Sequence, residues 1–202
     1  MFERFLAAFT VTDGPSVTDR LTLATVGDWL DVAGGRTFEG GLYRVHTRTS
    51  ARASDALVRA AFPEFTGRLT SFGYDWLGRQ FATDTDRGAI DDPEVLMFEP
   101  GTGEALEIPV PFSRFHDEEL VDYTEEALAR NFFDQWRHSG GPAPAASECV
   151  GYQRPLFLGG KDTVANLEIS DLDVYWTIMG QLRRQAMGLQ EGTSISGAAR
   201  DE

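Results

Sequence analysis

One stretch of the chain, residues 149–182, carries the most information about the fold: CVGYQRPLFLGGKDTVANLEISDLDVYWTIMGQL. The apolar run at residues 155–158 predicts a strand. The pair Gly159-Gly160 predicts a turn, because glycine accepts backbone angles that other residues avoid. This turn carries Lys161, the only lysine in the chain. A short polar bridge and then an amphipathic helix are expected to follow.

The helix of this stretch is the best-defined element in the sequence. Ser170 is expected to cap it, with Asp173 three residues later in the position of a capping box. Gly188 is a natural stop at its C-terminal end. Its expected buried face follows helical spacing and consists of Tyr175, Ile178, Met179 and Leu182. We also expect core positions for Leu156, Phe157, Leu158 and Trp176.

The first third of the chain is mostly helical in pattern. A short helix is predicted where four apolar side chains recur at helical spacing, at Phe2, Phe5, Leu6 and Phe9. A second helix is predicted over about residues 17–32, and a strand over residues 42–46. Ser54 is expected to cap a third helix, which Pro63 ends.

Residues 68–110 have the pattern of a β-sheet. Short apolar runs separated by turn residues predict strands at residues 69–74, 79–82, 95–98 and 105–110. The sequence EPGTGE at residues 99–104 predicts a hairpin between the last two. We interpret residues 84–94 as a polar, acidic loop. Trp76 and Phe81 are expected in the core, with Asp75 and Arg79 as a candidate ion pair.

Helical spacing returns after Pro111, with Leu128, Phe132 and Trp136 on one face, and residues 140–147 form a connector. The sum is an α+β fold, with a central antiparallel sheet and helices packed on one face of it. We predict an N-terminal helical extension at residues 1–33, an α+β domain at residues 34–189 and a flexible tail at residues 190–202.

The composition is that of a soluble globular protein, with 42% hydrophobic and 25% charged residues among 202. Eighteen basic and thirty-two acidic residues give a formal net charge of −14. Nucleic acid is itself an anion, so this charge argues against direct nucleic-acid binding. The acidity either serves solubility or complements a basic partner. The chain lacks a signal-peptide pattern and a long apolar run, which predicts a cytoplasmic protein that does not bind membranes.

The sequence contains no recognisable catalytic or metal-binding motif. The segment GGKDT at residues 159–163 lacks both the first glycine and the hydroxyl residue of a phosphate-binding loop. The acidic residues from Asp84 onward do not have the spacing of an EF-hand, and the three histidines lie far apart. The single cysteine, Cys149, has no nucleophile signature. We therefore predict a protein that is not an enzyme and binds no cofactor or metal.

Three segments, in this order, are similar to a known family: GYDWLGRQFA at residues 73–82, VLMFEPGTGE at residues 95–104, and residues 151–182. Together they resemble the Tdi-type C-terminal immunity domain of proteins that neutralise type VI secretion DNase effectors. This domain is related to the Smi/Knr-like immunity superfamily. The resemblance covers about residues 40–188 and implies a Smi/Knr-like α+β fold. Residues 1–33 are too short for the GAD-like module that some relatives carry.

The resemblance implies a cognate toxin as partner, a basic nuclease domain whose active site the protein would occlude. The alternatives are a regulatory or scaffold binding module of the same superfamily, and an unrecognised enzyme that uses paired carboxylates. Loop positions on a rigid scaffold suit recognition, and acidic groups suit a basic partner. The candidate partner-binding residues chosen on these grounds are Gly159, Gly160, Lys161, Asp162, Asn166, Glu168, Asp84, Asp86, Glu118 and Glu119.

Overall fold

The computed structural model describes residues 2–14 and 25–188. Its strands form a seven-stranded sheet, in the order β1 to β7, and a separate two-stranded sheet of β8 and β9. All neighbouring strands are antiparallel. The strands are β1 (Val11–Asp13), β2 (Thr37–Phe38), β3 (Tyr43–Val45), β4 (Leu69–Asp75), β5 (Gln80–Ala89), β6 (Asp92–Glu99), β7 (Glu104–Pro111), β8 (Glu148–Tyr152) and β9 (Leu167–Asp171).

Helices precede, interrupt and follow this sheet. The α-helices are α1 (Glu3–Ala8), α2 (Val26–Ala33), α3 (Arg48–Ala61), α4 (Phe112–Arg114), α5 (Leu120–Asp122), α6 (Thr124–Leu128), α7 (Arg130–His138) and α8 (Leu172–Met187). One π-helix, η3 (Phe115–Glu119), links α4 to α5. The 3-10 helices are η1 (Glu39–Gly41), η2 (Pro63–Phe65), η4 (Leu156–Leu158) and η5 (Val164–Asn166). No helix within residues 2–14 and 25–188 is long and apolar enough to cross a membrane.

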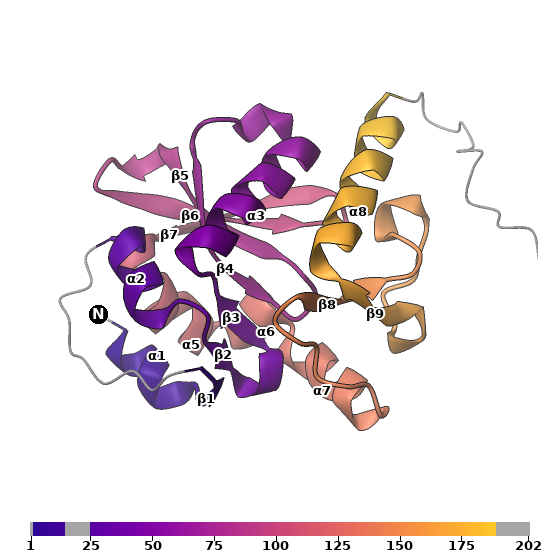
Figure 1. Ribbon diagram of the computed structural model, residues 1–202, viewed down its shortest axis with the longest axis horizontal. Helices are drawn as coiled ribbons and strands as arrows, with labels where there is room; N and C mark the ends of the chain where they lie inside the picture. Colours follow the sequence, from indigo (N-terminus) through magenta and orange to yellow (C-terminus); the bar gives the residue numbers. More distant parts are fainter. Residues whose placement is uncertain (1, 15–24, 189–202) are drawn as a thin grey trace, which may run out of the picture.

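The large sheet lies between two helical layers. Successive side chains of a strand point to opposite faces, and the core divides accordingly. One face packs on α1, α2 and the α4–α5 segment through Phe72, Phe81, Val95 and Met97. The other packs on α3 and α8, which lie side by side in Figure 1, through Tyr74, Ala82, Leu96 and Phe98. The α+β class and the antiparallel sheet are confirmed, but the expectation that helices cover only one face is wrong.

The N-terminal helix is part of the main core. Its predicted apolar stripe is confirmed, and Phe2 stacks on Trp29 of α2 with ring centroids 4.3 Å apart. Phe5, Phe2 and Trp29 have no exposed surface. A capping box on Thr25 begins α2. The first part of the predicted second helix, residues 17–24, lies outside the described residues, as does the tail at residues 190–202. The division at residue 33 stays a prediction.

The turn between β4 and β5 joins the sheet to the C-terminal part of the chain. The predicted ion pair is confirmed, since Nε of Arg79 donates to Asp75 at 2.6 Å. Two indole N–H groups link the turn to helices: Trp76 of the turn donates to the carbonyl of Leu128 in α6 at 2.9 Å, and Trp176 of α8 donates to the carbonyl of Gly78 in the turn at 2.7 Å. The turn therefore fixes α6 and α8 relative to the sheet.

The structure differs from expectation within residues 149–182. The strand lies earlier, at β8, and the apolar run at residues 155–158 forms the 3-10 helix η4. Pro155 cannot donate to a strand ladder, and Gly159 ends the run in the left-handed region at φ 76°. Side chains of η4 are half-buried rather than core. The predicted polar bridge contains strand β9.

The cap of helix α8 lies one residue later than predicted. The cap is Asp171, whose carboxylate accepts from the backbone N–H of Val174 at 3.0 Å, so the predicted cap at Ser170 is wrong. The buried face consists of Leu172, Tyr175, Trp176, Met179 and Gly180. Ile178 lies six residues after Leu172, which turns it to solvent, and it is 48% exposed. The predicted core role of Ile178 is wrong.

Three further elements correct the sequence expectations. Residues 84–94 are not a loop, because β5 and β6 continue through most of this segment as a hairpin. Helix α3 begins after Thr47, which forms a capping box with Ser50, and Ser54 lies buried inside the helix. The helix expected through Leu128 and Trp136 is interrupted at Ala129, which adopts φ 49° between α6 and α7.

Candidate partner-binding site

A pocket with a polar, hydrogen-bonded floor lies between α3, the start of α8 and the inner strands β4 and β5 of the large sheet. Its cavity volume is about 240 Å³. The floor is formed by strands β4 and β5, together with His46, which directly follows β3. Helices α3 and α8 form the walls. The lining residues are His46, Ser50, Ala53, Ser54, Leu57, Tyr74, Gln80, Ala146, Ser147, Asp171, Leu172 and Asp173.

Four polar side chains form a hydrogen-bonded network at the floor. Oε1 of Gln80 lies 2.7 Å from Nε2 of His46 and accepts from the hydroxyl of Ser54 at 2.8 Å. Nδ1 of His46 lies 3.1 Å from the hydroxyl of Ser50. Among the described residues, Nε2 of Gln80 has no hydrogen-bond partner. One buried polar atom of the floor therefore lacks a hydrogen-bond partner. His46, Ser54 and Gln80 are each at least 97% buried.

His46 is held in its neutral form. Burial lowers its pKa to about 4, although the hydrogen bond to Gln80 acts in the opposite direction. The ring of Tyr74 stacks on His46 with centroids 4.6 Å apart. The Tyr74 hydroxyl donates to the carbonyl of Ala146 at 2.7 Å, which fixes the connector of residues 140–147 against the sheet.

The arrangement of Ser50, His46 and Gln80 is not suited to nucleophilic catalysis. A general base functions best with a pKa near the working pH, and the third residue here is an amide rather than a carboxylate. The Ser50 hydroxyl is also engaged in the cap of α3, where it accepts from the backbone N–H of Thr47 at 2.9 Å. Burial raises the pKa of the Cys149 thiol, which opposes a role as nucleophile. In the described part of the chain, no cluster of three His, Cys, Asp or Glu side chains could hold a metal ion.

The rim of the pocket is acidic. Asp171 and Asp173 are exposed at the start of α8, and Glu148 faces Asp171 across the β8–β9 ladder. None of the ion pairs between residues that the structure describes includes these three carboxylates. Asp171 caps α8 and Asp173 lies in its first turn, so the start of the helix favours both carboxylates, but neither has a cationic side chain as partner among the described residues.

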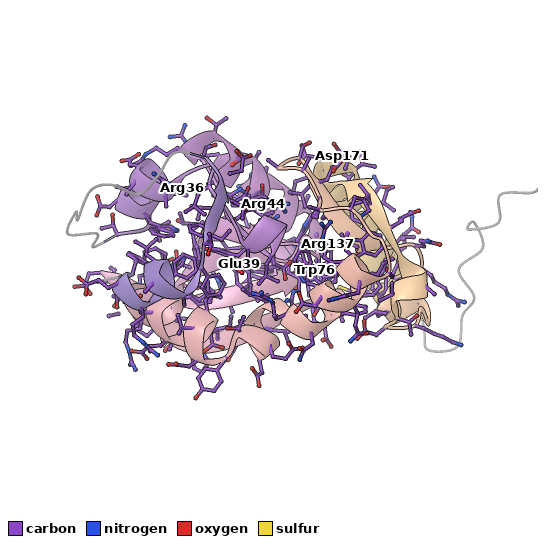
Figure 2. The ribbon with its side chains drawn as sticks, turned by 90° about the horizontal axis from the view of Figure 1, so that it is seen from below. Arg36, Glu39, Arg44, Trp76, Arg137 and Asp171 are labelled. Carbon is purple, nitrogen blue, oxygen red and sulfur yellow. The ribbon has the colours of Figure 1, made fainter. Side chains whose placement is uncertain are left out.

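A buried arginine lies beside the pocket without lining it. The guanidinium of Arg44 lies over the Tyr74 ring at 5.7 Å and donates from Nη2 to the carbonyl of Pro144. Burial lowers the pKa of Arg44, while Tyr74, Asp75 and Glu148 favour its charged form. A side chain at Gly41 would come within 2.5 Å of Nη2, so glycine is needed there. Figure 2 shows Arg44 towards the middle of the molecule and Asp171, the last residue of β9, farther towards the C-terminal part.

The predicted recognition turn is held in place by hydrogen bonds within its own segment. The side chain of Asn166 accepts from the backbone N–H of Arg154 at 3.0 Å, and its Nδ2 donates to the carbonyls of Arg154 and Lys161, both at 2.9 Å. Asp162 accepts from the hydroxyl of Tyr152 at 2.7 Å. Gly159 ends η4 in the left-handed region, and a side chain at Gly160 would overlap the carbonyl of Arg154. Lys161 and Glu168 are exposed.

The other predicted contact residues lie elsewhere. Asp84 has a fully buried carboxylate, which pairs with Arg68 at 2.8 Å, so it cannot present a surface charge. Asp86 pairs with the same arginine at 2.9 Å. Glu118 on η3 pairs with Arg114 at 2.7 Å, and burial raises the pKa of its neighbour Glu119. The β5–β6 hairpin and the segment beside α8 lie at opposite ends of the molecule in Figure 1.

Comparison with known proteins identifies the C-terminal segment. Residues 111–183 match the family model described as T6SS immunity protein Tdi1, C-terminal. This segment, called the Tdi1-type segment below, is therefore similar to that immunity domain. The match covers less than half of the chain. No curated protein matches the sequence.

Most of the fold resembles that of a solved structure. The crystal structure of Atu4351 from Agrobacterium tumefaciens has 17% sequence identity and a TM-score of 0.59, with 90% of this chain and 89% of that chain covered. The Tdi1-type segment supplies part of the pocket, through Ser147 and the acidic rim at Asp171 and Asp173. The floor comes from residues before that segment. The pocket thus exists only when both parts of the chain fold together.

Proposed function

We propose that this protein is a type VI secretion immunity protein that binds a cognate toxin in the cytoplasm and occludes the toxin's active site. The observation that carries the proposal is the match of residues 111–183 to the Tdi1 C-terminal immunity family. The pocket chemistry favours a binding role over nucleophilic catalysis, because His46 is neutral and the hydroxyl of Ser50 is engaged in the cap of α3. The protein acts as an inhibitor by contact and not as an enzyme.

The charge of the chain favours a basic toxin, such as a nuclease domain with a DNA-binding groove. The formal net charge is −14, and charge complementarity accelerates association more than it tightens the complex. A stable complex of this kind buries about 1,600 Å² in total. The association rate should fall steeply as salt rises from 50 to 500 mM, because salt screens charges that are more than about 10 Å apart. An association rate that does not change with salt would show that charge does not steer the encounter with the toxin.

The decisive experiment is co-expression with the product of the neighbouring gene. Host survival and co-purification are scored together, with a catalytically inactive form of that product as the control for toxicity. Rescue together with a stoichiometric complex is the expected result. Toxicity without rescue, or rescue without a complex, would contradict the proposal. A complex with a product that is not toxic would favour a regulatory or scaffold module instead.

A further inference from the structure

We infer that the pocket between α3 and α8 is the receptor for a single arginine side chain of the toxin. The inference rests on the proposed function in one respect, that the protein's partner is a toxin. The pocket itself is defined by residues of both halves of the chain.

The size of the pocket suits one side chain. Its volume of about 240 Å³ lies below the ~300–1,000 Å³ of pockets that take drug-sized ligands. It opens to solvent, because Ala53, Asp171 and Asp173 at its mouth are exposed. A long, unbranched side chain could cross the rim and reach the floor. Buried arginine anchors of this kind often dominate the affinity of protein interfaces.

The charge of the pocket selects a cation. The exposed carboxylates of Asp171 and Asp173 line it, and neither forms an ion pair with any residue in the described ranges. His46 adds no positive charge at neutral pH, since burial lowers its pKa to about 4. Arg44 does not line the pocket. The negative charges of Asp75 and Glu148 lie near its guanidinium and interact with it favourably. A carboxylate ligand would meet repulsion at the same mouth.

The floor can present a hydrogen-bond acceptor to a guanidinium. Amide and imidazole orientations are set by their partners. In the alternative orientation, Nε2 of Gln80 donates to Ser54 and to Nε2 of His46, and Nδ1 of His46 donates to Ser50. The hydroxyl of Ser54 then donates to Ser71, which lies 3.1 Å away. Oε1 of Gln80 becomes the atom without a partner, and a guanidinium donor would complete it.

The pocket can be tested without the toxin. The probe is N-acetyl-arginine methylamide, titrated into the full chain and followed by NMR. We expect saturable shifts at the side-chain amide of Gln80 and the backbone amide of Asp173, with a Kd in the millimolar range. The matched probe is the citrulline analogue, which has the same shape and no charge. It should bind at least tenfold more weakly, and equal binding or no binding by arginine would overturn the inference.

Two matched variants test the location. Ala53 and Ala56 are both exposed on α3, but only Ala53 lines the pocket. Ala53→Trp should fill the mouth and weaken arginine binding at least tenfold, whereas Ala56→Trp should leave it unchanged. Equal losses in the two variants would overturn the inference. Asp173→Asn should also weaken binding, with Asp91→Asn at the tip of the β5–β6 hairpin as its control.

The same variants separate this inference from the proposed function. In the co-expression assay, the wild type and Ala56→Trp should protect the host, and Ala53→Trp should lose at least tenfold in affinity for the toxin. If Ala53→Trp binds and protects as well as the wild type, the arginine receptor is wrong and the immunity function stands. If the wild type gives no rescue, the proposed immunity function is wrong. The titration with the arginine probe still tests whether the pocket binds an arginine side chain.

Discussion

The guanidinium of Arg79 contacts two parts of the fold at once. Its Nε donates to Oδ2 of Asp75 at 2.6 Å, and its Nη2 donates to the carbonyl of Ala127 at 3.0 Å. The other carboxylate oxygen of Asp75 accepts from the backbone N–H groups of Leu77 and Arg79. All of these groups are buried. The pair therefore closes the β4–β5 turn and joins it to α6, within the Tdi1-type segment.

Replacing Arg79 should strongly destabilise the protein. Arg79→Gln leaves the carboxylate of Asp75 buried without its counter-ion and removes the link to Ala127. Breaking one side of a buried ion pair costs about 3–5 kcal/mol of unfolding free energy. Urea unfolding followed by tryptophan fluorescence measures this loss.

Arg114→Gln is the matched control for this prediction. Arg114 and Glu118 also form an Arg–carboxylate pair four residues apart, but the Arg114 side chain is 58% exposed. Exposed pairs contribute little because water already solvates both charges. The unfolding midpoint should barely move. Equal losses in the two variants would show that burial is not what makes the Asp75 pair important.

Local sequence patterns predicted much of the fold. The apolar spacing of α1, the hairpin signal at residues 99–104 and the pairing of Asp75 with Arg79 are each fixed by residues close together in the chain. The errors have two sources. Residues 84–94 are polar, which suggested a loop, but β5 and β6 pair with each other through this segment as a hairpin, with Gly88 opposite Pro93 and Ala89 opposite Asp92. The second source concerns the two helical layers. Which face of the sheet a helix covers depends on the side on which its connections pass the sheet, and local periodicity does not contain that information.

The pocket was missed for the same reason. His46, Ser54 and Gln80 have no mutual spacing that marks a site, and only the β3–β4–β5 register together with the packing of α3 brings them into contact. A sequence-based register for these three strands would have placed Gln80 beside Tyr74 and Tyr74 beside Arg44, two residues before His46. The acidic candidates were chosen by charge alone, which does not distinguish the buried Asp84 from an exposed carboxylate.

The stability of the protein should fall as pH drops from 7 to 5, partly because of His46. Its folded pKa of about 4 lies below the ordinary value of 6.5, so between these values the unfolded state binds more protons. Stability is then fully present above pH 6.5 and decreases with falling pH. From pH 7 to 5 this single group accounts for about 2 kcal/mol. Urea midpoints at the two pH values measure the effect.

The contribution of His46 can be isolated by substitution. His46→Gln does not titrate in this range, so its loss between pH 7 and 5 should be smaller than that of the wild type by about 2 kcal/mol. The remaining loss belongs partly to His116, whose pKa burial also lowers well below its ordinary value. An unchanged slope in His46→Gln would contradict the prediction.

Arg183 should matter far more than its neighbour Arg184. Arg183 donates to the carbonyls of Gly103 and Ala61 at 2.8 and 2.7 Å, and its guanidinium lies 3.9 Å from the centroid of Phe62. It thereby joins α8 to the end of α3 and to the β6–β7 turn. Arg183→Met should lower the unfolding free energy by roughly 2–4 kcal/mol, since hydrogen bonds to charged groups each contribute ~1.5–3 kcal/mol.

Arg184→Met provides the comparison on the same helix. Arg184 makes one hydrogen bond, to the carbonyl of Ala60, and is exposed. Its replacement should cost less than about 1 kcal/mol. Thermal unfolding of the two variants in parallel gives the answer. If Arg184→Met proves the more destabilising change, the contacts of Arg183 do not hold α8 in place.

Asp84 should act on stability and not on partner binding. Its carboxylate is fully buried, accepts from Arg68 at 2.8 Å and also accepts from the backbone N–H of Asp86 at 3.1 Å. Asp84→Ala should lower the unfolding free energy by about 1–3 kcal/mol, because the buried end of Arg68 loses a charged partner. Asp91→Ala, on the exposed hairpin tip, should stay within about 0.5 kcal/mol of the wild type. Below its unfolding transition, Asp84→Ala should bind the toxin with wild-type affinity, as isothermal titration would show. A selective loss of affinity in the folded Asp84→Ala protein would place the interface at the β5–β6 hairpin instead of the pocket.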